Sequence, residues 1–272
     1  MRAFRLAYDG RPFHGFQRQP SVPTVENALL SALSGLGVTD DEETVPPGYA
    51  AAGRTDAGVS ALAQTVAFDC PEWCSPRALN SRLPGSVRAW AAADAPDGFH
   101  ATHDAVRRSY VYDLYAPDID DEGARAAADA LSGERDFHNL TPDETGTVRD
   151  LSLSVERDGD FLVVRATAGG FARELVRRLV SVVRGVGGGD LALSDVDRLL
   201  GPESVEGPDG VPPAPPEPLV LVEAAYPELT FERDADAAAS AAEVFGRRRR
   251  DGLVRARVAG RIREGVEGTK SR

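Results

Sequence analysis

The stretch of the chain with the clearest chemical potential is 53–61, GRTDAGVSA, where a single carboxylate, Asp56, follows the guanidinium of Arg54. A lone aspartate two residues before Gly58 is typical of a turn, because Asp and Gly tolerate the backbone angles that turns require. A carboxylate can also act as a nucleophile that divides a difficult exchange of bonds into easier steps. It needs no histidine for this, since its ordinary pKa keeps it ionised near neutral pH. Both interpretations of Asp56 are open on these residues alone.

An arginine stripe in the range 172–186, ARELVRRLVSVVRGV, could supply the cation that keeps such a carboxylate charged where water is excluded. The apolar periodicity of this range predicts an amphipathic helix. On that helix Arg173, Arg177 and Arg184 would lie within roughly 40° of one another. The stripe is either a solvated helix face or a surface for an anionic partner.

The cysteines and histidines do not have the spacing of a metal site. Cys70 and Cys74 are separated by three residues and fall short of a structural zinc set. The four histidines do not have the paired helical spacing of a zinc protease, and the glycine-rich range 185–190, GVGGGD, lacks the lysine of a phosphate-binding loop. We expect neither a metal nor a cofactor.

The length of 272 residues suits one large domain or two of about 130 residues each. No apolar run approaches the roughly 20 residues that a membrane span needs. The start of the chain, MRAFRLAYDG, lacks the long apolar stretch of a signal peptide, so we expect a cytoplasmic protein without a membrane contact.

The charge is negative overall but unevenly distributed. The net charge is −12, and Lys270 is the only lysine, a composition typical of proteins adapted to very high salt. Residues 247–272 hold ten Lys or Arg against three acidic residues, a net charge of +7, which leaves −19 on the rest. This basic tail either contacts RNA or is a disordered appendage.

Hydrophobic patterning predicts the elements that must position these residues. Strands are expected at 2–8, 63–69, 86–94, 108–115 and 219–226, with a hairpin at 151–169 around Asp158-Gly159. Further helices are expected over 24–37, with Thr24 as N-cap, and from Pro76 after the cap Ser75. The Pro- and Gly-rich range 201–218 predicts a loop. Because strands and helices mix without strict alternation, an α+β fold with helices on one face of a sheet is expected.

Six segments, in order, resemble the TruA family of tRNA pseudouridine synthases and cover roughly residues 3–230. They are YDGRPFHGFQRQP (8–20) with the following TVENAL, GRTDAGVSALAQ (53–64), FHATHDAVRRSYVY (99–112), SGERDFHNL (132–140), GGFARELVRRLV (169–180) and APPEPLVLVEAAYP (214–227). The resemblance implies two similar ferredoxin- or RRM-like α/β subdomains, 1–103 and 104–230, followed by an extension at 231–272. Together they would form one extended, mainly antiparallel mixed sheet, with helices on one face and an RNA-binding cleft on the other.

The resemblance also implies a reaction. The N1–C1′ bond of a uridine is broken, the base rotates while it is held, and a C5–C1′ bond is made, without a cofactor. The substrate would be tRNA, at positions 38 to 40 of the anticodon stem-loop, bound across both subunits of a homodimer. Asp56 would be the nucleophile, Arg177 its ion-pair partner, and Tyr110 the aromatic surface that stacks on the extruded uracil. Attack at the sugar, addition at C6 of the base and a glycal route are all open.

RNA contacts are expected from arginine, whose guanidinium groups clamp phosphates and stack on bases. The predicted set is Arg54, Arg107, Arg108, Arg173, Arg177, Arg178 and Arg184. Two rival classes are open: a non-catalytic RNA-binding protein, in which Asp56 is dispensable, and a glycosidase-like hydrolase, which would require a second carboxylate. Asp9 and Asp69 are the nearest candidates in sequence for that second group.

Overall fold

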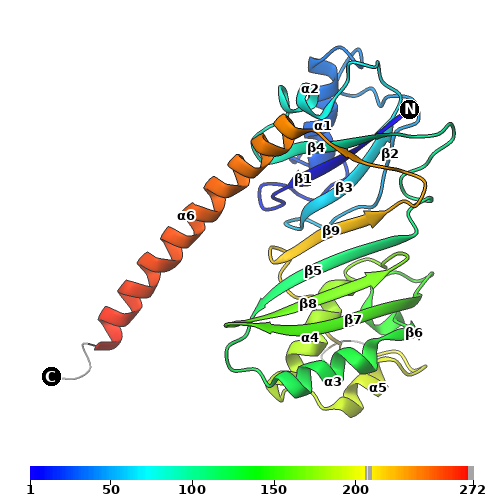
Figure 1. Ribbon diagram of the computed structural model, residues 1–272. Coiled ribbons are helices and arrows are strands. Elements are labelled where there is room, and N and C mark those ends of the chain that lie inside the picture. The colour runs from blue at the N-terminus through cyan, green and yellow to red at the C-terminus, as the bar shows by residue number, and fades with distance from the viewer. Residues whose placement is uncertain (206, 208–209, 269–272) are drawn as a thin grey trace.

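The computed structural model describes residues 1–205, 207 and 210–268. Its strands form one sheet in the order β10-β4-β1-β3-β9-β5-β8-β7-β6, with β2 paired to β3 (Figure 1). The strands are β1 (Arg2–Tyr8), β2 (Ala50–Ala51), β3 (Ser60–Phe68), β4 (Val87–Asp94), β5 (Arg107–Tyr115), β6 (Gly133–Asp136), β7 (Val148–Asp158), β8 (Phe161–Ala168), β9 (Leu219–Ala225) and β10 (Glu232–Arg233). Among the described strands only β3 and β9 pair in parallel. The predicted α+β class is confirmed.

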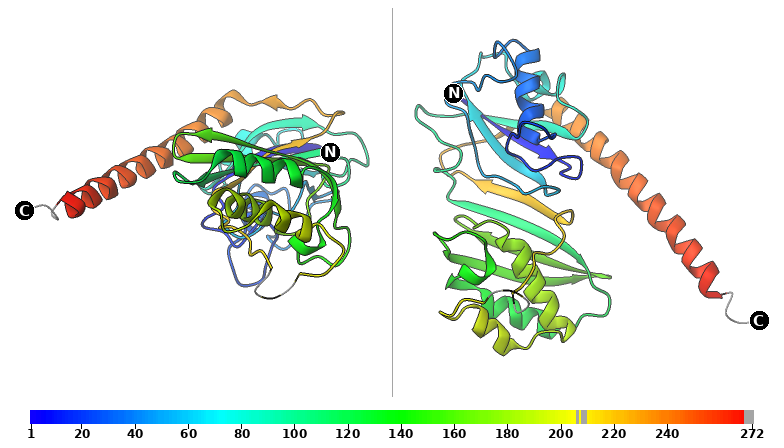
Figure 2. Two further views of the ribbon diagram at one scale, coloured as in Figure 1. Left: turned by 90° about the horizontal axis from the view of Figure 1, so that it is seen from below. Right: turned by 180° about the vertical axis from the view of Figure 1, so that it is seen from behind.

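The helices divide between the two faces of the sheet. They are α1 (Val25–Gly35), α2 (Pro76–Asn80), α3 (Asp121–Leu131), the 3-10 helix η1 (His138–Leu140), α4 (Leu175–Gly188), α5 (Leu193–Leu199) and α6 (Ala235–Gly268). Helices α1 and α2 pack on the first half of the sheet and α3, α4 and α5 on the second, in two apolar cores. Helix α6 leaves on the side opposite α3, α4 and α5 (Figure 2).

Strand β9 joins the two halves, because it lies between β3 and β5 although it comes late in the chain. Tyr110 of β5 packs against both apolar cores, so the junction is filled by side chains as well as by backbone pairing. The subdomain boundaries at 1–103 and 104–230 remain a prediction.

Local signals fixed several element boundaries as predicted. The Thr24 hydroxyl accepts a hydrogen bond from the backbone N–H of Asn27 at the start of α1, and Ser75 caps α2 in the same way, with Pro76 at its first position. The predicted hairpin forms between β7 and β8, with Gly159 and Asp160 in its turn directly after Asp158. The predicted helix at 172–186 begins later, at Leu175, because Glu174 adopts a left-handed conformation with φ of 61°.

Most of the C-terminal extension is a single helix, which the sequence analysis did not predict. Helix α6 has 34 residues, and only its first part lies against the sheet, through contacts with β4 (Figure 1). Lys270 and the other residues of 269–272 lie outside the described part. Across the described residues, α6 included, every helix is too short or too polar to span a bilayer.

Candidate active site

The loop that carries Asp56 runs between β2 and β3 and is held by the N-terminal motif. The backbone N–H of Phe16 donates to the carbonyl of Thr55 at 3.0 Å, and that of Gly58 donates to the carbonyl of Phe13 at 3.2 Å. The buried Thr55 hydroxyl also shares a 2.8 Å hydrogen bond with the phenol of Tyr8. These bonds fix the loop on both sides of Asp56, which explains physically why the two sequence motifs occur together.

Two glycines of that motif allow the backbones to approach this closely. A Cβ at Gly10 would stand 2.0 Å from the carbonyl oxygen of Val59, and one at Gly15 would stand 2.8 Å from that of Thr55. Gly15 also has φ of 93°, a conformation that favours glycine. The sequence analysis used these glycines as part of a resemblance and did not identify their role.

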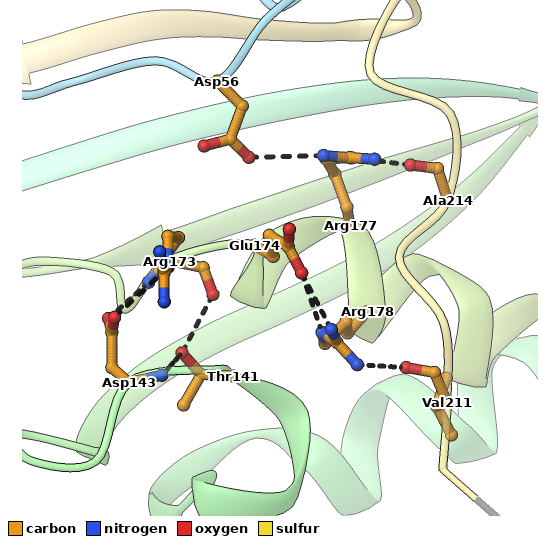
Figure 3. Close-up of polar contacts among 9 residues, drawn as sticks. All are labelled: Asp56, Thr141, Asp143, Arg173, Glu174, Arg177, Arg178, Val211 and Ala214. Atoms are coloured by element: carbon orange, nitrogen blue, oxygen red, sulfur yellow. Dashed lines mark hydrogen bonds and ion pairs between the residues drawn. The ribbon is translucent and has the colours of Figure 1, made fainter. Parts of the chain in front are cut away.

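Asp56 forms an ion pair with Arg177 across the cavity (Figure 3). Nη1 of Arg177 donates to Oδ2 of Asp56 at 3.3 Å, while Nε of the same guanidinium donates to the carbonyl of Ala214 at 2.6 Å. The Arg177 side chain is 14% exposed and that of Asp56 32%. The guanidinium is thus fixed before any substrate arrives, and it brings together two residues that are 121 positions apart.

Burial and charge act in opposite directions on Asp56. Desolvation raises the pKa of the carboxyl above its ordinary value, and the attraction and hydrogen bond of Arg177 partly offset this increase. Glu174 adds to the increase and Arg173 reduces it. Arg177 is therefore the group that favours the ionised carboxylate in a partly dehydrated site.

A cavity of about 810 Å³ opens in front of this ion pair, between the Asp56 loop and the start of α4. Tyr110 lines it and meets Phe171 edge to face, with ring centroids 5.2 Å apart. Burial raises the pKa of the Tyr110 phenol to about 12, so the hydroxyl is neutral near pH 7. Tyr112, on the same face of β5, is buried in the core below.

The cavity lies on the face of the sheet that carries α1 and α4, because Glu26 of α1, the start of α4 and the residues just before α4 line it. The cleft expected on the opposite face is therefore wrong in position. The reason is that α1 and α4 cover separate halves of the sheet and leave the junction at Tyr110 uncovered.

Two more predicted arginines reach the cavity. Arg54 lines it with an exposed side chain that makes no hydrogen bond or ion pair within the described part of the chain. Arg173 lines it from the segment before α4, where its side chain lies 3.5 Å from Asp143 and its backbone N–H donates to the same carboxylate (Figure 3). Since Arg173 is outside the helix, the predicted stripe of Arg173, Arg177 and Arg184 on one helix face is wrong.

Arg107, Arg178 and Arg184 lie outside the lining of the cavity. Arg178 is held by Glu174 at 2.8 Å and by the carbonyl of Val211 at 2.6 Å (Figure 3). Arg107 forms a two-pronged pair with Glu223 at the start of β5. Arg184 is exposed two turns along α4 from Arg177.

Arg108 has a structural position that the sequence analysis did not foresee. Its buried guanidinium donates to the carbonyls of Ala52, Thr102 and Gly169 at 2.6 to 2.9 Å. Ala52 precedes the Asp56 loop and Gly169 precedes the Phe171 segment, so this one side chain ties both walls of the cavity together. Because Arg108 is buried, the structure does not support the predicted direct contact of this residue with RNA.

The remaining carboxylates of the cavity are occupied by other groups. Asp143 and Glu174 bind Arg173 and Arg178, and Glu26 accepts from the backbone N–H of Arg18 at 2.6 Å. Asp9 and Asp69 do not line the cavity. Within residues 1–205, 207 and 210–268, no three His, Cys, Asp or Glu side chains converge as metal ligands would.

Comparison with known proteins identifies the family. A family model described as tRNA pseudouridine synthase matches residues 127–227. A protein named tRNA pseudouridine synthase A from Haloarcula marismortui is 59% identical over 275 residues, which cover 98% of this chain and all of that protein. Its namesake from Natronomonas pharaonis is 60% identical over 264 residues, or 96% and 98% of the two chains. The namesake from Methanothrix thermoacetophila is 40% identical over 237 residues, 85% of each chain.

The first two of these relatives come from halophiles, in agreement with the acidic, lysine-poor composition. The resemblance that was drawn from six short segments is confirmed by alignments that run through the Asp56 loop, β5 and α4 alike. Identity of this extent over nearly the whole length of both chains shows that the chain belongs to the tRNA pseudouridine synthase family, a family of isomerases.

Proposed function

We propose that this tRNA pseudouridine synthase acts on uridines 38, 39 and 40 of the anticodon stem-loop, with Asp56 as the nucleophile. The observation that carries the assignment of Asp56 is its ion pair with Arg177 at the wall of the cavity that Tyr110 lines. The segments that align with the family's motifs supply the substrate positions.

Asp56 serves the reaction as a transient covalent partner of the nucleotide. Its carboxylate attacks either the sugar or the base, the N1–C1′ bond breaks, the held base turns, and C5 bonds to C1′ as the carboxylate leaves. In the last step C5 loses its proton, and N1, which has lost its bond to C1′, carries a proton in the product, so no atom is lost overall. Arg177 stabilises the carboxylate each time it is released as an anion, because its guanidinium is already oriented by the Ala214 carbonyl.

Tyr110 and Arg54 would hold the substrate around that carboxylate. A uracil that leaves its stack costs a few kcal/mol, and an aromatic ring in the cavity replaces part of the lost stacking. Tyr110 is half-buried and braced by Phe171, so its ring is fixed for this role. Arg54 is exposed at the rim and can bind a phosphate.

The experiment replaces Asp56 by Asn, a change that keeps the size of the side chain and removes its charge. We expect pseudouridine formation on anticodon stem-loops to fall by on the order of 10⁴-fold or more, because the covalent step is lost. Affinity for tRNA should stay within a few-fold. The readout is chemical labelling of pseudouridine followed by primer extension, with binding measured in parallel.

Asp118→Asn is the matched control, since Asp118 is exposed in the turn after β5 and outside the lining of the cavity. Full activity of Asp56→Asn would favour a non-catalytic role for this residue and overturn the assignment. Release of free uracil by the wild-type protein would instead favour the hydrolase alternative. Labelled positions other than 38, 39 and 40 would contradict the substrate assignment alone.

A further inference from the structure

Asp9, a buried carboxylate of the N-terminal motif, has two arginine partners, although one would neutralise its charge. Arg11, two residues away, binds both oxygens of the carboxylate at 2.8 and 2.7 Å, and its backbone N–H donates to Oδ1 at 3.2 Å. The second partner is Arg248 of α6, whose Nη1 donates to Oδ2. This contact joins two residues that are 239 positions apart. The C-terminal helix is thus tied directly to the N-terminal motif.

The packing of α6 places Arg248 beside that carboxylate. The helix contacts β4 (Figure 1), and β4 pairs with β1, the strand that Asp9 follows. Ala237, Ala241 and Val244 are buried residues of α6. Spacings of four, three and four residues from 237 to 248 put Arg248 on the same side of the helix as this row. Arg248 is therefore the polar end of the face with which α6 packs on the body.

The two arginines hold Asp9 in different ways. The Arg11 side chain is 61% exposed and belongs to the same turn as Asp9, so this pair moves with the turn. The Arg248 side chain is 33% exposed and is carried by a helix that packs on the sheet, so this pair fixes the turn to another element. Burial raises the pKa of Asp9, and hydrogen bonds and charge from both arginines bring it below the ordinary value.

The residue after Asp9 lies directly against the loop that carries Asp56. A Cβ at Gly10 would stand 2.0 Å from the carbonyl oxygen of Val59, so the two backbones are in close contact. The Gly10 N–H donates to the Ser60 hydroxyl at 3.0 Å, and the Val59 N–H donates to the carbonyl of Asp56 at 3.1 Å. A shift of Asp9 would therefore displace the Asp56 loop through atoms that already touch.

The same turn supports the Asp56 loop at a second point. The carbonyl of Gly10 accepts from the backbone N–H of Phe13 at 2.9 Å, and the carbonyl of Phe13 accepts from that of Gly58 at 3.2 Å. The loop has little tolerance for movement, because the hydrogen bond from Arg177 to Asp56 is already long, at 3.3 Å. A displacement of reacting groups by about 1 Å costs on the order of 100-fold in rate.

We propose that Arg248 is a positioning residue for the isomerisation, and that it acts through Asp9 to fix the Asp56 loop. Helix α6 would support the loop from the side of the sheet opposite α4 (Figure 2). Among the described residues, Arg248 and Asp9 stand outside the lining of the cavity, so neither is placed to touch the substrate. The inference rests on the proposed function in one respect, the catalytic role of Asp56, and not on which uridines are modified.

The test compares Arg248→Ala with Arg247→Ala in the full chain. Arg247 is the matched control, because it is 58% exposed and pairs with Glu243 of the same helix. Single-turnover rates at saturating tRNA and dissociation constants are measured on the same samples. We expect Arg248→Ala to lower the rate about tenfold and to leave the dissociation constant within about twofold, because the loop is loosened and the arginines of the cavity are untouched. Arg247→Ala should keep the wild-type rate.

Two further variants distinguish positioning from a general loss of stability. Arg248→Lys keeps the charge at this single contact and should stay within about threefold of the wild-type rate. In an Asp9→Asn background, Arg248→Ala should lower the rate no further, because the charge on which it acts is gone. Denaturant unfolding shows that each variant is folded under the assay conditions. Arg248→Gln keeps most of the side chain and takes the place of Arg248→Ala if the alanine variant does not fold.

A wild-type rate for Arg248→Ala, or an equal loss for Arg247→Ala, would overturn the proposal. It would also be overturned if Arg248→Ala weakened tRNA binding and kept the rate at saturation, since Arg248 would then be an RNA contact. Asp56→Asn in the same assay separates this inference from the proposed function. An inactive Asp56→Asn with a wild-type rate for Arg248→Ala refutes the role of Arg248 alone, whereas a fully active Asp56→Asn refutes the proposed function and this inference with it.

Discussion

The two walls of the cavity hold their arginines in different ways. On the α4 wall, Arg177 binds Asp56 and the carbonyl of Ala214, and Arg173 binds Asp143. On the wall formed by the Asp56 loop, Arg54 is exposed and makes no hydrogen bond or ion pair with any described residue. The same residue type is fixed on one side and free on the other, within one cavity of about 810 Å³.

This difference separates two tasks. A guanidinium whose position is fixed in advance can stabilise charge during the reaction without reorganising. A free guanidinium gains its partner only from the substrate, so it contributes to binding and not to the intrinsic geometry of the site. The comparison predicts that substitutions on the α4 wall affect turnover and those on the loop wall affect affinity.

Arg177→Ala should give the largest effect. Turnover is expected to fall by about 10²–10³-fold, because the fixed cation beside Asp56 is lost, while tRNA affinity changes only a few-fold. Single-turnover rates and binding curves on the same anticodon stem-loop separate the two quantities. Arg178→Ala is the matched control, because Arg178 is the next residue of α4 and lies outside the lining of the cavity. A comparable loss of turnover in this variant would contradict the specific role of Arg177.

Arg108→Ala should loosen both walls together. Removal of its guanidinium leaves the carbonyls of Ala52, Thr102 and Gly169 without this donor, which should cost about 3 kcal/mol in the free energy of unfolding. Arg107→Ala, one residue earlier, breaks only an exposed pair with Glu223 and should leave the free energy of unfolding nearly unchanged. Denaturant unfolding of both variants measures the difference, and equal stabilities would contradict the bridging role of Arg108.

The pH dependence of turnover should show how burial and Arg177 act in opposite directions on the pKa of Asp56. The carboxyl must be ionised to attack, so turnover falls as the pH drops through its pKa, which burial raises above the ordinary value. Arg177→Gln removes the opposing charge, so the pKa rises further and the acid limb moves to higher pH. Arg177→Lys keeps the charge and should move the limb less. An acid limb at the same pH in all three proteins would show that another group titrates.

Arg54→Gln should give the smallest effect, and it tests the role of the wall formed by the Asp56 loop. We expect tRNA affinity to fall a few-fold and the slope of log affinity against log salt to decrease by about 1, as for the loss of one phosphate contact. Turnover at saturating tRNA should be nearly unchanged. Arg107→Gln is the control, since Glu223 already neutralises that arginine. A larger fall in turnover than in affinity for Arg54→Gln would reverse the assigned roles.

Elements with local signals are predictable from this sequence. The caps Thr24 and Ser75, Pro76 and the hairpin turn after Asp158 each act over a few neighbouring residues, and the structure has them as expected. Helix α3 was missed because its apolar face consists mostly of alanine, which gives weak periodicity. The first half of α6 hides its packing face in the same way.

The site depends on contacts that no local pattern reports. Asp56 by itself is typical of a turn, and it was singled out through a family resemblance and not through its spacing. Its pairing with Arg177, the left-handed Glu174 that excludes Arg173 from α4, and the three carbonyls around Arg108 are all set by tertiary packing. The residue types predicted an aspartate paired with an arginine. Tertiary packing determines that the arginine beside Asp56 is Arg177.

The place of β9 has a consequence for how the protein is made. Residues 219–225 separate β3 from β5, so a nascent chain that has not yet reached them has two unpaired strand edges where the finished sheet is continuous. Ala214, which orients the guanidinium of Arg177, also comes from this late segment. Neither half of the chain can complete the cavity during synthesis, and catalytic competence begins only when the last strand of the junction has left the ribosome.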